Sequence, residues 1–405
     1  MKTWMRRTLW GVGLLLGLPF LLFLLWFLVN LRDVPAQPWP EALALPRNTL
    51  APEHNLGVAL EAAPAPDKDF GPSLKPCASP DCLADWRASL DKQAGPRARS
   101  AAFGAICEAL TAQADLRYQD AMPETLRLNW MFPPLTRVSR CHQWLLGRAL
   151  TAAMGGEATE SMRWLAQADR LDRAVLESSR SLIAQMIGAS MWGRKLSLLQ
   201  GVALLQPSLS AELAARAQLD ARHMLARQHE WIRVEASVNR STIDELTQAG
   251  CDARLLSGEV QQAWQCFTAQ GMQPEYSKQL FARRWQDAQA VLAQADTLPA
   301  ALPGLRQALM QVPEGWWPQV RHTVPLVLDE VAGPVYPGYF ERFADLQLAS
   351  EATRLWLLDA RAPLPERASA ALRQRLSPDP QGGWRLMPWD NESSGRMPLH
   401  WAAPA

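Results

Sequence analysis

The chain has 405 residues, with 41 Lys and Arg against 40 Asp and Glu, which gives a formal net charge of +1 at pH 7. A charge balance this close to zero offers no basic surface that could neutralise a run of phosphates, so nucleic acid is not expected as a partner. The phosphate-cradling pattern G-x-x-x-x-G-K is absent from the sequence, and no nucleotide is expected either.

The first predicted element is a transmembrane helix over residues 9–31. Leu9 to Val29 carry no charged side chain, and at about 1.5 Å per helical residue this run crosses the roughly 30 Å hydrocarbon core of a bilayer. Basic side chains gather in residues 1–8, so the positive-inside rule places those residues in the cytoplasm. A signal peptide cleaved after Ala36 is the alternative, although its apolar core would exceed the ~7–15 residues usual for such peptides. Either way, the remainder of the chain is expected on the far side of the membrane.

The amino-acid composition indicates the kind of organism, and therefore the kind of membrane, to which the predicted helix belongs. The chain is rich in Ala and Arg and contains only six Lys among its 41 basic residues. This usage is typical of GC-rich bacterial genomes, so we expect a single-pass, signal-anchored protein of the bacterial inner membrane. Its C-terminal domain would lie in the periplasm.

All six cysteines follow the predicted anchor, and an even number suits a compartment in which disulfides form. Local spacing favours three pairs among 15 possible pairings. A structural zinc site is the alternative, but no further ligand pair accompanies the first two cysteines. We therefore expect no metal and no cofactor, and the predicted disulfides are Cys77 with Cys82, Cys107 with Cys141, and Cys251 with Cys266.

Residues 32–76 are predicted to form a stiff, proline-rich periplasmic spacer. Ten prolines occur between Asp33 and Pro80, and proline lacks the amide donor that a helix or an interior strand needs. Within this segment Asn55 to Leu60 is expected to form a short strand or turn that packs on the domain.

Residues 77–380 are predicted to form a helical periplasmic domain, because apolar residues recur at helical spacing and Gly and Pro separate the segments. Ser79 and Pro80 have the residue types of a helix cap and a first helical position. Pro96 is expected to open the second helix, and Pro134 precedes the third. Further helices are predicted over residues 158–177, 181–205, 210–234, 258–269, 276–294, 305–312 and 339–359.

Two stretches in this domain are similar to each other. Residues 156–168 and residues 258–267 both place a glycine, a small residue five positions on, and a large apolar residue nine positions on. This resembles the second helix of tetratricopeptide repeats, in which the small residue lets two helices approach closely. No continuous 34-residue period links the two stretches, so an irregular domain of helical hairpins is the alternative to a repeat fold.

The C-terminal tail, residues 381–405, carries the one strand signal of the chain. Trp384 to Pro388 and Met397 to His400 flank a turn-forming segment, which favours a small β-hairpin. The expected fold class is therefore mostly α, with an N-terminal transmembrane helix and a possible C-terminal hairpin.

No catalytic constellation emerges from the sequence. None of the six histidines has the H-E-x-x-H arrangement of a metalloprotease. Enzymes that cleave cell-wall glycan use one carboxylic acid, and three Glu-Ser dipeptides occur, at Glu160, Glu177 and Glu392. A match of two residues is too short to assign that chemistry.

Tryptophan is over-represented, with 18 in the chain. Most of these indoles lie on apolar helix faces and are expected in the core. The adjacent pair Trp316 and Trp317, between Pro313 and Pro318, is the candidate for an exposed aromatic binding site.

These observations favour a membrane-tethered periplasmic scaffold or protein-interaction domain without catalysis. Its expected partners are the lipid bilayer, through residues 9–31, and another protein of the cell envelope. The alternative is a cell-wall-directed protein that binds glycan or cleaves peptidoglycan.

Overall fold

A computed structural model describes most of the chain. The residues described are 18–30, 32–47, 49–67, 70–71, 81–119, 135–250, 273–311, 313–323, 325–326, 335–360, 362–380, 382–389 and 397–402.

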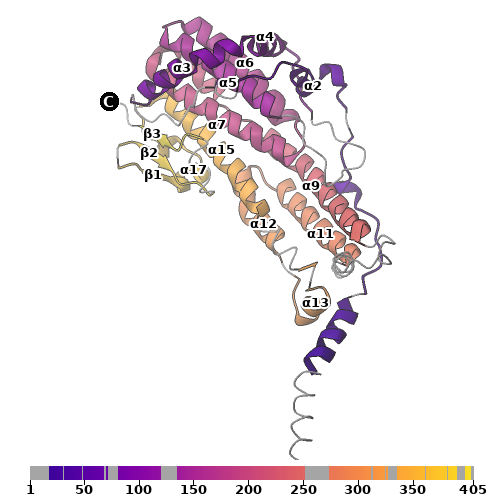
Figure 1. The fold of residues 1–405 in the computed structure, drawn as a ribbon. Helices are drawn as coiled ribbons and strands as arrows, with labels where there is room; N and C mark the ends of the chain where they lie inside the picture. The colour runs from indigo at the N-terminus through magenta and orange to yellow at the C-terminus, as the bar shows by residue number, and fades with distance from the viewer. Residues whose placement is uncertain are drawn as a thin grey trace, which may run out of the picture.

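The described residues are predominantly helical, which confirms the predicted fold class at that level (Figure 1). Successive helices lie side by side in an elongated stack, with three short strands toward one end and α13 at the other (Figure 1). In chain order the elements are η1 (Glu41–Leu43), η2 (Pro52–His54), α2 (Leu56–Glu61), α3 (Asp81–Arg99), α4 (Ala101–Thr111), α5 (Leu135–Met154), α6 (Ala158–Ser178), α7 (Leu182–Leu205), η3 (Pro207–Leu209), α8 (Ser210–Arg216), α9 (Ala221–Gly250), α11 (Pro274–Ala293), α12 (Leu298–Met310), α13 (Trp316–Arg321), α15 (Val335–Leu358), α16 (Leu364–Arg367), α17 (Ala370–Arg375), β1 (Leu376–Pro378), β2 (Trp384–Leu386) and β3 (His400–Trp401).

Residues 18–30 form a helix that precedes η1 and projects from the end of the stack where α13 lies (Figure 1). Among the described residues no helix is both long enough and apolar enough to cross a bilayer. Residues 1–17 and residue 31 lie outside the described part, so the predicted span over residues 9–31 stays a prediction.

The described parts of the predicted spacer lie against the helical domain. Leu43 is fully buried, and its carbonyl accepts hydrogen bonds from Trp39 Nε1 at 3.1 Å and Ser237 Oγ at 3.3 Å. Arg233 donates to the Ala44 carbonyl at 2.9 Å, and Arg180 donates to the Arg47 carbonyl at 2.7 Å. Proline removes amide donors but not carbonyl acceptors, so side chains of the domain can bind this segment without any regular structure in it.

The expected strand or turn at Asn55 to Leu60 is wrong, because Leu56 begins the short helix α2. The Asn55 side chain caps that helix by accepting a hydrogen bond from the Gly57 amide at 3.0 Å. Leu56 and Leu60 then face the core four residues apart.

The helices from α3 to α7 follow the predicted boundaries closely, apart from Pro96. That proline lies inside α3 rather than at the start of a new helix, and the break falls at Ser100 instead. The Ser100 hydroxyl donates to the Pro96 carbonyl at 3.0 Å, which satisfies an acceptor at the end of α3. Gly156 has a φ of +76° in the turn between α5 and α6, a conformation that favours glycine.

Helix α7 is the centre of the domain. Buried residues occupy every side of it, so it shows no apolar stripe, as expected for a helix surrounded by protein. It packs against α5, α6, α9 and α15. The predicted helix over residues 210–234 is divided in the structure into α8 and α9, and α12 begins at Leu298 rather than Leu305.

The C-terminal strands form a three-stranded antiparallel sheet in the order β1-β2-β3. Arg385 pairs with His400, so the predicted association of residues 384–388 with residues 397–400 is confirmed, whereas β1 was not predicted. Because β1 precedes residue 381, the sheet crosses the boundary expected between domain and tail. One hydrophobic core extends from Leu43 to Trp401.

Of the two stretches that suggested a tetratricopeptide repeat, one lies within the described residues. Residues 158–168 form the first half of α6, packed against α5 as a helical hairpin. The second stretch, residues 258–267, lies outside the described residues, as do the predicted helix 258–269 and the tail's turn residues 390–396.

Candidate functional site

The candidate site is a surface groove of about 700 Å³ between α3 and α5. Its lining combines an apolar floor with charged edges, on which three arginines face one aspartate. The lining residues are Arg87, Leu90, Asp91, Ala94, Arg97, Ala98, Ala101, Trp144, Arg148, Thr151, Met154 and Gly155.

Helical spacing explains why these side chains share the groove. On α3, Arg87, Leu90, Ala94 and Arg97 follow one another at intervals of three or four residues, so they project from one face. The lining residues of α5 recur at the same intervals. The helical repeat alone aligns the groove-facing residues within each helix. The packing of α3 beside α5 then brings these two rows of residues together.

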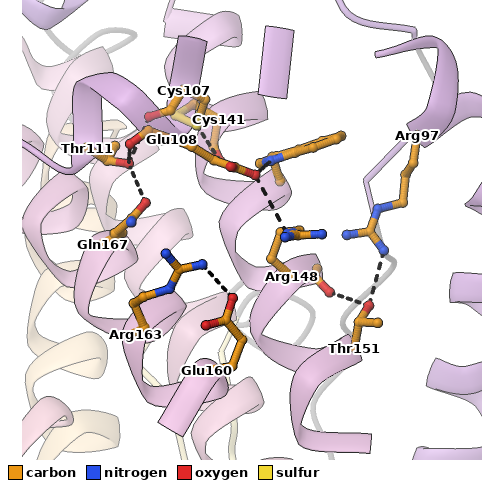
Figure 2. Close-up of polar contacts among 12 residues, drawn as sticks. Arg97, Cys107, Glu108, Thr111, Cys141, Arg148, Thr151, Glu160, Arg163 and Gln167 are labelled. Atoms are coloured by element: carbon orange, nitrogen blue, oxygen red, sulfur yellow. Dashed lines mark hydrogen bonds and ion pairs between the residues drawn. A yellow bond between two sulfur atoms is a disulfide. The ribbon is translucent and has the colours of Figure 1, made fainter. Parts of the chain in front are cut away.

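Arg97 is one of the three arginines that line the groove. Its guanidinium donates to Thr151 Oγ1 at 3.4 Å and lies 5.7 Å from the ring centre of Trp144. Figure 2 shows Arg97 and Arg148 converging on the same space, with Thr151 below Arg97. Burial and the nearby Arg148 cation both lower the pKa of Arg97 from its ordinary value. The described residues contain no carboxylate bonded to this guanidinium, so its charge is available to an anionic group.

Trp144 forms the wall on the α5 side. Its indole Nε1 donates to Glu108 Oε1 at 2.8 Å, and the same carboxylate oxygen lies 3.6 Å from Arg148 Nε (Figure 2). Gly104 on α4 leaves room for the ring, since a Cβ placed there would lie 2.1 Å from Trp144 Cζ2. The indole is therefore fixed in orientation by a hydrogen bond on its edge and by glycine against its face.

The Cys107–Cys141 disulfide, one of the three predicted, joins α4 to α5 behind this wall with a Cα–Cα distance of 5.5 Å (Figure 2). It fixes α5 three residues before Trp144. Cys82 is also disulfide-bonded. Cys77, Cys251 and Cys266 lie outside the described residues, so the other two predicted pairings stay predictions.

Arg148 also belongs to a stack on the neighbouring Trp164 ring. The guanidinium carbons of Arg148 and Arg163 lie 4.7 Å and 4.2 Å from the ring centre, and Arg163 bonds Glu160 at 2.5 Å. That hydrogen bond lowers the pKa of Glu160. A general acid for glycan cleavage needs a raised pKa, so Glu160 does not fit that role. Glu177 lies on α6 away from this groove, and Glu392 is outside the described residues.

A second cluster of charged residues is enclosed in the protein interior. Lys195 Nζ lies 2.7 Å from Asp169 Oδ1, 3.2 Å from Asp172 Oδ2 and 3.2 Å from the ring centre of Trp192. His142 Nε2 lies 3.1 Å from Asp172 Oδ1, and Arg216 bonds Asp169 at 2.5 Å. The contacts of Asp172 with His142 and Lys195 are within ion-pair distance, but they lack the geometry of hydrogen bonds.

This cluster links four helices, since its members come from α5, α6, α7 and α8. Burial alone would raise the pKa of Asp172, but the neighbouring His142 and Lys195 outweigh it and hold that pKa below its usual value. His142, Asp172 and Lys195 have no solvent exposure. A substrate has no path to them, so we interpret the cluster as structural.

Sequence inspection missed both clusters, because each assembles from separate helices. It also passed over a Ser-x-x-Lys spacing at Ser89 to Lys92 on α3. In serine acyltransferases a lysine base must be desolvated to lose its proton near neutral pH, and Lys92 is exposed to solvent. That spacing therefore carries no catalytic assignment.

The predicted aromatic pair lies far from the groove, on α13 (Figure 1). Trp316 is 72% exposed and Trp317 47% exposed, and the two rings meet edge to face with centres 5.4 Å apart. Within the described part of the chain no three His, Cys, Asp or Glu side chains are grouped so that they could hold a metal ion.

No protein-family model, curated protein or solved structure matches this chain. The chemistry of the groove therefore rests on its own residues. Exposed cations above an apolar floor suit a ligand that presents a carboxylate or another anion beside an apolar group.

Proposed function

We propose that this chain is a membrane-tethered, non-catalytic binding domain of the bacterial cell envelope, and that it captures an acidic segment of another envelope protein in the groove between α3 and α5. The observation that carries the proposal is the imbalance of charge in the groove. Arg87, Arg97 and Arg148 line the groove with one carboxylate, Asp91, and of the three arginines Arg148 also has Glu108 within ion-pair distance, at 3.6 Å.

The chemistry of the groove supports a peptide partner. The arginines offer fork-shaped donors for carboxylates, while Leu90, Met154 and the Trp144 ring offer apolar surface between them. Protein interfaces combine these features, with aromatic and Arg side chains at the centre. A peptide segment with two or three acidic residues around one apolar side chain would complement the positive charge and the apolar surface of the groove.

The tether supports the location. The predicted span over residues 9–31 has no charged residue up to Val29, and the described helix 18–30 exposes large apolar side chains from Leu18 to Leu28. Positively charged residues precede the span. The proposal places the helical domain, with its Cys107–Cys141 disulfide, in the periplasm.

Site-specific photo-crosslinking in living cells tests this function. A photoreactive phenylalanine derivative at Leu90 lies in the groove, whereas the same probe at Lys92 lies on the same helix outside the groove lining. We expect one discrete adduct from position 90 and none from position 92. Equal labelling at both positions, or no adduct at position 90, contradicts the proposed binding site.

The second candidate function is the binding or cleavage of cell-wall glycan. The exposed pair Trp316 and Trp317 favours it, because flat aromatic surfaces stack on sugar rings. Incubation of the purified full chain with peptidoglycan tests it. Retention on sacculi that is lost on the double change Trp316→Ala and Trp317→Ala would support this candidate, as would release of soluble fragments.

A further inference from the structure

Helix α13 is attached to the C-terminal end of the apolar N-terminal helix. Trp26 Nε1 donates to Thr323 Oγ1 at 3.2 Å, just beyond α13, and Asn30 Nδ2 donates to the Val320 carbonyl at 2.9 Å. Figure 1 shows the two helices next to each other, at the end of the molecule from which the N-terminal helix projects. The position of α13 along that helix is therefore fixed at its last turn.

The attachment extends into the domain through Gln273. Its side-chain amide donates to the carbonyl of Asn30 at 2.8 Å and to the carbonyl of Arg321 at 2.7 Å. Asp33 follows by accepting hydrogen bonds from the amides of Glu275 and Tyr276 at 2.8 and 3.0 Å, which caps the first turn of α11. The N-terminal helix, α13 and α11 are thus joined by bonds that leave little freedom between them.

The large exposed side chains of α13 are mostly apolar. Trp316, Trp317 and Val320 are exposed, and Gln319 is the exposed polar residue among them. On the neighbouring helix 18–30 the exposed side chains are also apolar, and they are Leu18, Phe20, Leu21, Leu22, Phe23, Leu24, Leu25 and Leu28. Both helices therefore expose large apolar side chains at this end of the molecule, where they contact each other.

We propose that α13 lies in the interfacial layer of the bilayer that holds the N-terminal helix, with Trp316 and Trp317 among the lipid headgroups, so that the domain has a fixed orientation on the membrane. This inference rests on the proposed tether. Residues 26–30 cover about 6 Å along a helix axis, and the headgroup layer on each side of the hydrocarbon core is roughly 5–8 Å deep. Residues 26–30 form the last turn of the predicted span, so α13 lies at the outer edge of the hydrocarbon core, where the core meets the headgroup layer.

The indole side chain suits this depth, because its ring is apolar while its N–H binds water or a headgroup. Arg32 is exposed one residue beyond the predicted span, where a guanidinium can meet a lipid phosphate. A lipid surface explains the two tryptophans, Val320 and the adjoining leucines together. A sugar would explain the tryptophans alone.

Fluorescence quenching of the full chain in proteoliposomes tests the proposal. The probe is the difference spectrum between the wild-type protein and the double variant Trp316→Phe, Trp317→Phe. In vesicles of phosphatidylethanolamine and phosphatidylglycerol that are brominated at the acyl-chain carbons nearest the headgroup, we expect this difference signal to lose about half of its intensity or more, because interfacial indoles lie at that depth. Aqueous iodide should quench it little. The matched control is Trp389→Phe, whose difference signal comes from the opposite end of the domain and should be unaffected by brominated lipid.

Alkaline extraction of membranes, run alongside, separates this inference from the proposed tether. If the chain stays in the membrane and the pair is quenched by iodide but not by brominated lipid, the placement of α13 is wrong and the tether stands. If the chain is released by alkali, the tether itself fails, and the inference with it. Binding to peptidoglycan that the double variant loses would overturn the inference in favour of a sugar.

Discussion

Gly104 and Trp144 are in direct contact across α4 and α5, and the glycine has no room for a side chain. A Cβ on Gly104 would lie 2.1 Å from Cζ2 and 2.2 Å from Cε2 of the indole. The Trp144 ring is also a wall of the proposed binding groove, so this contact links the packing of the domain to the shape of its site.

Gly104→Ala is expected to destabilise the protein by about 1–3 kcal/mol, the usual cost of overpacking a core, because Trp144 or the α4 backbone must move. The indole also loses its alignment with Glu108. Urea unfolding of the purified full chain measures the effect. The matched control is Gly95→Ala on α3, where the nearest atom to the new Cβ is 3.6 Å away on a flexible arginine side chain. That change should be neutral or stabilise by up to about 1 kcal/mol, and equal destabilisation by both changes would contradict the packing account.

Loss of the Cys107–Cys141 disulfide is expected to cost about 3–4 kcal/mol on the chain-entropy relation for a separation of 34 residues. The double change Cys107→Ser and Cys141→Ser makes this loss without touching the other cysteines. Thermal unfolding under oxidising conditions measures it. An unchanged midpoint of thermal unfolding would show that the disulfide does not stabilise the folded protein.

Lys195, on α7, is the cation that the buried carboxylates of Asp169 and Asp172 share, and Lys195→Met removes it. Breaking a buried ion pair from one side costs about 3–5 kcal/mol when the remaining charge is left uncompensated. Here Arg216 still pairs with Asp169 and His142 with Asp172, so we expect a loss at the lower end of that range, about 3 kcal/mol. Lys92→Met, at an exposed position, should change stability by less than about 0.5 kcal/mol. A variant Lys195→Met as stable as the wild type would show that the cluster contributes no net stability.

Glu235 provides a pH-dependent test. Burial raises the pKa of Glu235 to about 7, despite a hydrogen bond from the Leu182 backbone that lowers it. The folded state therefore holds this proton at pH values where the unfolded state has lost it. The stabilisation is fully present below the unfolded pKa near 4.5 and is lost as pH rises through about 7.

The expected loss is on the order of 3 kcal/mol at most. Comparison of urea unfolding for the wild type and Glu235→Gln from pH 5 to pH 8 isolates it, because other titrating groups contribute equally to both proteins. The difference between the two stabilities should change with pH in that interval. Glu212→Gln, an exposed position on α8, should show no such change, and parallel pH profiles for wild type and Glu235→Gln would contradict the buried carboxyl.

The local parts of the fold were predictable from sequence, because helical periodicity is a property of neighbouring residues. Helices α6, α7 and α11 begin and end within about two residues of their predicted limits, as short-range signals allow. The pairing of Arg385 with His400 was also predicted, as part of a hairpin between residues 384–388 and 397–400. The division of residues 210–234 into α8 and α9 was not, since Ala217 to Asp220 contain neither Gly nor Pro.

Contacts between segments far apart in the chain could not be predicted from the sequence. Proline content predicted no helix between residues 33 and 80, which is wrong at α2, and it could not show that Arg180 binds the carbonyl of Arg47, 133 residues away. Lys195 meets the histidine and aspartates of its cluster only after α5, α6 and α7 have packed. The groove depends in the same way on the packing of α3 beside α5, which no periodicity encodes.

The most direct test of the proposed function is charge reversal in the groove. Arg87→Glu and Arg173→Glu make the same charge change at two exposed arginines, and only Arg87 lines the groove between α3 and α5. The measurement is the yield of the photo-crosslinked adduct from position 90 in each variant, relative to the unchanged chain. We predict that Arg87→Glu lowers the yield about tenfold, as a loss of roughly 1.4 kcal/mol in binding would, while Arg173→Glu leaves it unchanged. Equal yields in the two variants would contradict the assignment of this groove as the binding site for an acidic partner.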